Sequence, residues 1–502
     1  FSNGCLAGGG IHAEMAGKAR AKAKQGQAAA EKAAARPGAW PRRATSAAAG
    51  AVAVAAAVVA RTWPEIIARG RTNGALGALR AGACDFGTLD GPGMVQALNL
   101  SELGGTPLPA GLRCPVVLRL AEAEAWAELR RWGDFSELER RTPSTVAFDA
   151  SSSGEFAYWD NASLLAPAVR SAGLLRQGYR KVRARRRDFF KALTQGSDSA
   201  LGSVRFGGKV ADFSSDAARG LAARARELAP GGPAASAPSL WLSAGGSYST
   251  AHYDSFHNLF IMLGGEKHVL LSPATDAPLF HIYPGTHPLA RQARRHFGQA
   301  EAPASARVLA ASVRGGEALF IPAGWLHHVT ARSAAVSLAL TVLPQEHHDF
   351  NAWMVEGGGS VLPFLAAAGA WDTPRLAAAL RAFTPALLES VEFGEAWARR
   401  EEDPLETFVN VNYGIQTRRE LGWPPRLPAY GPCGQPGAAD REAARAAAAQ
   451  VARRFNAFQE ELRGLYIMPY LETALSRVAG AERDPAKIMQ ITVGFVETCL
   501  RK

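Results

Sequence analysis

The sequence predicts a protein with a mainly β core of the sandwich or barrel type, flanked by helices and followed by an α-helical C-terminal region. Two patterns support this fold class. Short apolar segments broken by Gly and Pro fill residues 238–345, which is typical of an all-β sandwich or barrel. From about residue 350 onward, apolar residues recur at helical spacing. Apolar residues make up 47% of the chain, which is enough to build a packed core.

Residues 1–62 precede this fold and are of low complexity. They are rich in Ala, Lys and Arg, and Glu14 and Glu31 are their only acidic residues. Such a segment is typical of a disordered basic tail or of an organellar transit peptide. A secretory signal with residues 47–60 as its apolar core is a third interpretation, which we favour least because that stretch begins far from the first residue. We therefore leave this segment out of the predicted fold.

Residues 63–237 are expected to form an N-terminal α/β flank of the core. Apolar residues at helical spacing predict helices over 122–141 and 165–195. The second stretch carries the basic run "RKVRARRRDFF", which we interpret as a solvated helix face or loop, with a nuclear-import or nucleic-acid patch as the alternative. The segments with strand character are "CPVVLRL" (114–120), "STVAFDA" (144–150) and "GEFAYWD" (154–160).

Residues 238–345 are expected to hold the β core. "GGEK", residues 264–267, is expected to join two of its strands in a tight turn. The predicted strands are "SLWLSA", "NLFIML", "KHVLLSP", "RVLAASV", "EALFIP", "HHVTA" and "AAVSLALTVL".

Residues 346–502 are expected to be helical, with the longest helix over 438–478. Within it, "FQEELRGLYIMPYLETAL" (458–475) is apolar enough to pack either on the β core or on a second copy of the chain. Residues 424–437, "PPRLPAYGPCGQPG", read as an exposed loop.

Composition limits the class of protein without naming a function. The formal net charge of +11 permits an acidic partner such as nucleic acid, but does not require one. No apolar run reaches the roughly 20 residues that a membrane helix needs, so we expect no membrane partner. The five cysteines lie far apart and form no CxxC pair. That spacing argues against a disulfide scaffold or a zinc ribbon and favours a reducing compartment.

The histidines are concentrated in the β core, since ten of the eleven lie between residues 252 and 348. His252 and Asp254 are two apart, so at a strand end they project from the same face. Two histidines and one carboxylate can bind iron and leave three of its positions open. His327 can supply the second histidine from a distant strand. The alternative pair, His347 with Asp349, is followed by no histidine, and we interpret His347 and its neighbour His348 as surface residues.

Two spaced motifs surround these residues. The first motif comprises Gly246, His252, Asp254, Asn258 and Gly265, and the second Gly316, Pro322, Gly324 and His327. Their spacing resembles the two cupin signatures. Ala331 stands where the second signature usually has an asparagine. The form with Asp in the first motif resembles the JmjC group, and within it the small JmjC protein hydroxylases such as the asparaginyl hydroxylase of hypoxia-inducible factor.

This resemblance implies a double-stranded β-helix (a jelly roll, or cupin fold) and an Fe(II)- and 2-oxoglutarate-dependent dioxygenase that consumes O2. It implies that His252, Asp254 and His327 hold the iron, with the adjacent His328 turned away from it. Lys267 and Ser249 then correspond to the residues that bind the distal carboxylate of 2-oxoglutarate. Asn258 and Thr341 stand at the places of two further cosubstrate residues. The tyrosine expected near "SVRFGGKV" has no secure counterpart, and Tyr158 is a remote candidate.

Hydroxylation of a protein side chain is the function that this resemblance favours. Histone lysine demethylation and RNA-base hydroxylation are alternatives, as is a catalytically inactive cupin that serves as a binding module. Residues 274–306 are expected to cover the mouth of the pocket and to help choose the substrate. We expect a cytoplasmic or nuclear protein, with organellar targeting by the N-terminal segment as an alternative. The C-terminal helices are expected to form a homodimer or to pack within the chain.

Overall fold

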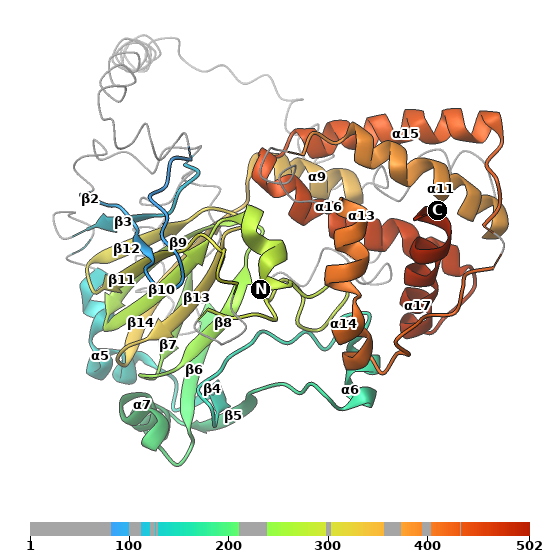
Figure 1. The fold of residues 1–502 in the computed structure, drawn as a ribbon. Helices are drawn as coiled ribbons and strands as arrows, with labels where there is room; N and C mark the ends of the chain where they lie inside the picture. Colours follow the sequence, from blue (N-terminus) through green and yellow to red (C-terminus); the bar gives the residue numbers. More distant parts are fainter. Residues whose placement is uncertain are drawn as a thin grey trace, which may run out of the picture. The chain divides into compact units, whose positions relative to one another are not determined.

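Figure 1 shows the computed structural model of the chain. The structure describes residues 82–99, 112–120, 126, 129–209, 238–297, 303–355, 373–393, 403–431 and 433–501. These residues belong to one compact unit that begins at Gly82. The segment predicted over residues 1–62 lies outside the described residues.

Two β-sheets form the core (Figure 1). The five-stranded sheet has the order β1 (Gly93–Met94), β11 (Leu309–Arg314), β10 (Glu266–Ser272), β13 (Leu326–Ala331), β8 (Tyr248–Tyr253). The nine-stranded sheet has the order β2 (Ala97–Asn99), β3 (Val116–Arg119), β12 (Glu317–Ile321), β9 (His257–Gly264), β14 (Ala335–Val342), β7 (Ser239–Ser243), β6 (Ser203–Lys209), β4 (Thr145–Ser151), β5 (Arg180–Arg185). From β11 to β14, consecutive strands alternate between the sheets, as in a double-stranded β-helix. The predicted mainly β core with a helical C-terminal region is confirmed.

An apolar cluster between the sheets holds them together. Val269 and Leu271 of the five-stranded sheet are fully buried together with Met262 and Leu319 of the nine-stranded sheet. Each such side chain contributes roughly 1.5–3 kcal/mol when it leaves water. Trp325 joins this cluster and packs between the sheets.

The seven strands predicted in this region are present as β7 and β9 to β14, and β8 is an additional one. The turn between β9 and β10 depends on Gly265, whose φ is +78°. A Cβ atom there would lie 2.2 Å from the carbonyl oxygen of Ala334, so only glycine fits.

Two predictions for the flank, residues 63–237, are wrong. Residues 154–160 form no strand, and Glu155 makes only an isolated bridge to Tyr248. The helix predicted over 165–195 is α6 (Ala166–Ala172), β5 and α7 (Arg186–Gln195). In β5 the half-buried Val182 and Ala184 alternate with exposed basic residues, which is the period of a strand. Because β5 is an edge strand, its outward charges cost little.

Part of the helix predicted over 122–141 is present as the 3₁₀ turn η2 (Arg130–Gly133) and α5 (Phe135–Arg141). Asp134 begins α5, since its carboxylate accepts hydrogen bonds from the amides of Ser136 and Glu137.

Seven helices are described beyond the core, and none of them combines the length and the apolar composition that crossing a bilayer requires. They are α9 (Gln345–Val355), α11 (Thr373–Ser390), α13 (Pro404–Thr407), α14 (Ile415–Glu420), α15 (Ala438–Asn456), α16 (Glu460–Leu475) and α17 (Pro485–Phe495).

The single helix predicted over 438–478 is wrong, because the chain turns at residues 457–459 and separates α15 from α16. Phe458 in this turn is buried against Phe455 and Tyr466, which fixes the break. Helix α16 packs on α15 and on η6 (Ala274–Phe280) next to the β core, so the apolar segment 458–475 packs within the chain. A homodimer through these helices stays a prediction.

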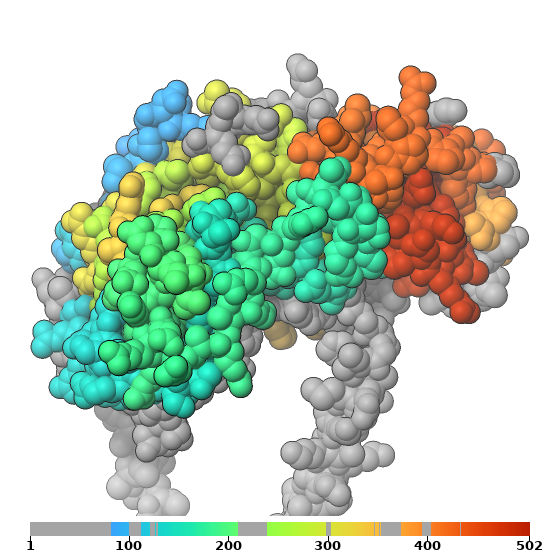
Figure 2. Space-filling model, turned by 90° about the horizontal axis from the view of Figure 1, so that it is seen from below, coloured from blue at the N-terminus to red at the C-terminus, as the bar shows by residue number. Residues whose placement is uncertain are grey.

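Helix α6 connects the flank to the C-terminal helices, since it packs against α14. The methyl group of Ala172 lies beside Gly422, just after α14. Figure 2 shows green residues of the flank next to orange and red residues of the C-terminal region.

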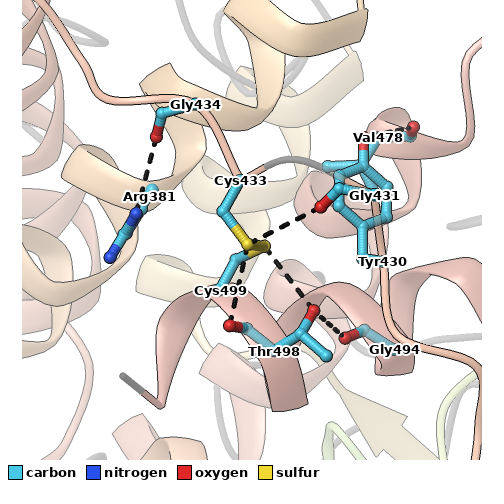
Figure 3. Close-up of a disulfide and its surroundings, with 9 residues drawn as sticks. All are labelled: Arg381, Tyr430, Gly431, Cys433, Gly434, Val478, Gly494, Thr498 and Cys499. Atoms are coloured by element: carbon cyan, nitrogen blue, oxygen red, sulfur yellow. Dashed lines mark hydrogen bonds between the residues drawn. A yellow bond between two sulfur atoms is a disulfide. The ribbon is translucent and has the colours of Figure 1, made fainter.

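Two disulfides correct the interpretation of the cysteines. Cys84 pairs with Cys114, and Cys433 pairs with Cys499, with Cα–Cα distances of 5.8 and 5.4 Å. Figure 3 shows the second pair, which ties the chain at Cys433 to the end of the last helix. The partners are 30 and 66 residues apart in the sequence, so a search for CxxC motifs cannot find them. The argument for a reducing compartment loses its basis.

The Cys433–Cys499 bond closes a long loop, so it limits the conformations of the unfolded chain. We expect the double variant Cys433→Ser/Cys499→Ser to lose roughly 2–4 kcal/mol of unfolding free energy in the absence of reductant. Guanidinium unfolding measures this loss. Equal midpoints for the variant and the unreduced parent chain would contradict the pairing.

Candidate metal centre

The candidate centre begins with a pair of histidines that face each other across two strands. His252, near the end of β8, is the direct antiparallel partner of His327 in β13. Their ring centroids lie 4.2 Å apart. Asp254 follows β8 directly, and its carboxylate oxygen Oδ2 is 3.8 Å from Nε2 of His327. One ligand atom from each of the three lies within 4.8 Å of the others, a spacing that a single metal ion can bridge.

An irregularity in β8 brings Ser249 to the same face. His327 pairs with His252, but Val329, two residues further along β13, pairs with Ser249, three residues back along β8. One extra residue is therefore present in β8, which is a β-bulge. Without the bulge, residues three apart would point to opposite faces of the sheet.

Backbone carbonyls fix the orientation of both imidazoles. Nδ1 of His252 lies 2.7 Å from the carbonyl oxygen of Thr250, and Nδ1 of His327 lies 3.0 Å from that of Trp325. A carbonyl can only accept, so each Nδ1 carries the hydrogen and each Nε2 keeps its lone pair for a metal. Burial, and secondarily the neighbouring imidazole of His327, lowers the pKa of His252 to about 3, so this imidazole is neutral at pH 7.

The other histidines near the centre have other environments. His257 accepts a hydrogen bond from the amide of Ala323, and burial lowers its pKa to about 4. His268 lies near the hydroxyl of Ser312, at 3.3 Å. His328 stacks on Tyr248, with ring centroids 5.4 Å apart. None of these belongs to the only cluster of metal ligands found among the described residues.

The prediction that His347 is a surface residue is wrong. The residue is 9% exposed, and its ring packs at a tilt against Tyr466 and Phe458 of the helical region. His347 lies in the first turn of α9, which directs its side chain toward the helical region. The sequence after β14 does not indicate this direction. His348, in contrast, has a side chain that is 66% exposed.

Lys267 lies between the two sheets. Leu271, four residues along β10, pairs with His327, so the side chains of Lys267 and His327 share a face of the five-stranded sheet. The Lys267 ammonium donates a hydrogen bond of 3.0 Å to the hydroxyl of Ser337, which belongs to the nine-stranded sheet. It also lies 4.7 Å from the ring centroid of Phe260. No described carboxylate forms an ion pair with it.

Asn258 and Thr341 are direct partners in the pairing of β9 with β14. The side-chain oxygen of Asn258 is buried and has no hydrogen-bond partner among the described residues. A buried polar atom without a partner is costly, so this oxygen is available to a ligand. The unpaired cation of Lys267 suits a small carboxylate-bearing molecule, whereas the Asn258 oxygen suits a ligand group that donates a hydrogen bond. Two imidazoles with one carboxylate suit Fe(II).

Sequence reasoning missed Arg291, which reaches the centre from the loop after η6. Arg291 has a φ of +67°, unusual for a residue with a side chain. Its guanidinium lies 3.6 Å from a carboxylate oxygen of Asp254. Its carbonyl accepts a hydrogen bond from the amide of Tyr253, and the amide of Ala293 donates to the carbonyl of Ala251. The loop predicted to cover the pocket mouth thus runs along β8 beside the metal ligands.

The C-terminal helices hold this loop. Arg294 forms a buried ion pair of 3.3 Å with Glu420 of α14. The carboxylate of Glu472 in α16 accepts hydrogen bonds from the backbone amides of Gly285 and Thr286. Burial raises the pKa of Glu472 to about 7.

The chain resembles one protein family and several known proteins over part of its length. Residues 112–350 match the family model of a cupin-like domain. The chain is 27% identical over 126 residues to the human (Homo sapiens) bifunctional peptidase and (3S)-lysyl hydroxylase JMJD7, a match that covers 20% of this chain and 40% of that protein. It is 29% identical over 110 residues to the lysine-specific demethylase JMJ31 of Arabidopsis thaliana, covering 20% of this chain and 19% of the relative. It is 28% identical over 126 residues to the lysine-specific demethylase JMJ32 of the same plant, covering 19% and 36%. Each match spans less than half of the relative's own length.

The buried cation of Lys267 should destabilise the protein when no anion is bound. Burial, and secondarily Arg205, lowers the pKa of Lys267 to about 7. We expect Lys267→Met to raise the free energy of unfolding by roughly 1–3 kcal/mol at pH 7.

The sign of the pH dependence follows from the direction of this shift. The folded-state pKa lies below the unfolded value of about 10.4, so the parent chain loses stability as the pH falls from about 10 to about 7. The gain from Lys267→Met should therefore be largest at pH 7 and shrink toward pH 10. Chemical denaturation at several pH values measures it, with the exposed Lys191→Met as the control. If Lys267→Met instead lowered the free energy of unfolding by the same amount at every pH, Lys267 would not be an unpaired cation in the folded protein.

Proposed function

We propose that the chain is a JmjC-type, Fe(II)- and 2-oxoglutarate-dependent dioxygenase that hydroxylates a protein side chain, which its match to a cupin-like domain over residues 112–350 and its similarity to a lysyl hydroxylase support. The observation that carries this proposal is the convergence of His252, Asp254 and His327 within 4.8 Å of one another. That donor set holds an iron ion on one side only and leaves its other side to ligands and substrate.

The roles of the residues follow from their positions. His252, Asp254 and His327 hold Fe(II), and the carbonyls of Thr250 and Trp325 keep both imidazoles aimed at it. Lys267 and Ser249 would bind the distal carboxylate of 2-oxoglutarate, and Asn258 and Thr341 would be further contacts of the cosubstrate. When bound, the iron and 2-oxoglutarate supply the oxidising chemistry by which O2 hydroxylates a C–H bond. The apolar cluster between the sheets keeps water out of this space.

A lysine side chain is the first substrate to test. The names of the three relatives all refer to lysine, as a lysyl hydroxylase or as lysine-specific demethylases. The alternatives are demethylation of histone lysines and hydroxylation of an RNA base, which the exposed basic residues of β5 favour. An inactive cupin that serves as a binding module is the alternative outside enzymes, and Thr341 in place of an asparagine is the feature that favours it.

We also propose that the protein works in an oxidising compartment rather than in the cytoplasm or nucleus. Four of its five cysteines are paired in two disulfides, and disulfides persist in oxidising surroundings. Its substrate would then be a protein that passes through the same compartment.

The enzyme proposal is tested by the conversion of 2-oxoglutarate to succinate. We expect the full chain with Fe(II) and ascorbate to form succinate, and Asp254→Ala to lower the rate about 100-fold or more because one iron ligand is lost. Asp349→Ala is the matched control, since Asp349 also lies two residues after a histidine but is exposed on α9. The control should retain full activity.

The succinate assay separates an enzyme from a binding module, and a second measurement separates two of the enzyme functions. No succinate from the parent chain, or equal rates for Asp254→Ala, would contradict the enzyme and favour the binding module. Mass spectrometry of treated lysine peptides then distinguishes hydroxylation, which adds one oxygen atom, from demethylation, which removes a methyl group.

A further inference from the structure

Arg205 lies on the inner face of the nine-stranded sheet. It pairs with Ser243 of β7, which pairs in turn with Ala335 of β14. Ser337 lies two residues further along β14. Residues paired across strands, and residues two apart along a strand, share a face, so Arg205 and Ser337 point to the same side. That side is where the Lys267 ammonium reaches Ser337.

Fixed contacts orient the guanidinium of Arg205. One nitrogen donates to the hydroxyl of Ser249 at 3.2 Å and to the carbonyl of Phe156 at 3.3 Å. The guanidinium carbon lies 4.5 Å from the centroid of the Phe156 ring. The other terminal nitrogen is 3.7 Å from the carboxylate of Asp149. Ser249 is the hydroxyl that the proposed function assigns to the distal carboxylate, so Arg205 contacts the cosubstrate pocket directly.

The charges around Arg205 leave the pocket positive. Its side chain is 13% exposed, and its Nε is buried without a hydrogen-bond partner among the described residues. Asp149 is the one described carboxylate that pairs with it, and Asp149 also pairs with Lys181 at 3.4 Å. Lys267, buried nearby, has no described carboxylate partner and is close enough for Arg205 to lower its pKa. The two buried cations therefore have only one neighbouring carboxylate, Asp149, which also pairs with Lys181. Leaving buried positive charge unbalanced destabilises the folded protein unless an anion binds.

We propose that Arg205 is a cosubstrate-binding residue that, together with Lys267, binds the distal carboxylate of 2-oxoglutarate. Asp149 and Phe156 are the residues that position it. A guanidinium offers several hydrogen-bond donors in a fixed plane, so it binds a carboxylate better than a single side-chain hydroxyl group can. Arg205 lies in the segment "SVRFGGKV", where the resemblance leads one to expect a tyrosine, so the cation takes that place. The inference rests on the proposed function, because it concerns the same pocket.

The test compares two 2-oxo acids that differ only at the far end. 2-Oxopentanoate has the chain length of 2-oxoglutarate but lacks the distal carboxylate. Calorimetric titration of the Mn(II)-loaded full chain gives the dissociation constant of each. We expect Arg205→Gln to weaken 2-oxoglutarate about 10- to 100-fold, the loss of one charged hydrogen-bonding partner, and to leave 2-oxopentanoate unchanged. Arg205→Lys should recover part of the loss.

Arg183→Gln is the matched control, because Arg183 is an exposed arginine on β5, the edge strand of the same sheet. It should bind both acids like the parent chain. Equal binding of 2-oxoglutarate by Arg205→Gln and the parent would overturn the assignment. So would an equal weakening of both acids, which is what a purely structural ion pair with Asp149 would give. If Arg205→Gln does not fold, the same comparison is made with Arg205→Lys, for which a selective weakening of 2-oxoglutarate supports the assignment and no selectivity overturns it.

The same titration separates this inference from the function on which it rests. A parent chain that binds neither Mn(II) nor 2-oxoglutarate contradicts the proposed function itself. A parent chain that binds both, with Arg205→Gln unaffected, contradicts only the role of Arg205.

Discussion

The pairing of β8 with β13 is the constraint on which the candidate site depends. It places His252 directly opposite His327, and the single extra residue in β8 turns Ser249 to the same face as the metal ligands. Because β13 also pairs with β10, the same strand fixes Lys267 relative to the histidines. Three strands of one sheet thus determine both the metal site and the cation for the cosubstrate. A shift of one residue in either pairing would turn these side chains to the opposite face.

The helices after the core act on this site through one loop. Arg294 is held by Glu420, and the backbone at Gly285 and Thr286 is held by Glu472. Between these anchors the loop returns to pair with β8, and Arg291 is placed beside Asp254 in a left-handed conformation. A backbone conformation of this kind costs energy and persists only where neighbouring contacts fix it. The C-terminal region therefore supports the geometry around the metal ligands from outside the β core.

The sequence allowed the triad and β13 to be predicted, because motif spacing at a strand end translates directly into position, but β8, which carries His252, was not among the predicted strands. Arg205 could not be predicted in this way. Its place beside Ser249 depends on the register of β6 on β7, and no local pattern encodes that register. The same reason applies to Ser337, which meets Lys267 only across the two sheets. The disulfides were missed because their partners are far apart in the sequence, and His347 because burial by α16 is a long-range effect.

X-ray absorption at the iron edge tests the central claim most directly, since it reports the ligands of the metal itself. For the Fe(II)-loaded full chain, the fold predicts scattering from two imidazole rings and a shell of oxygen neighbours. Replacement of His327 by alanine should remove one imidazole. A spectrum without imidazole scattering, or one that is the same in both proteins, would mean that iron does not lie between β8 and β13.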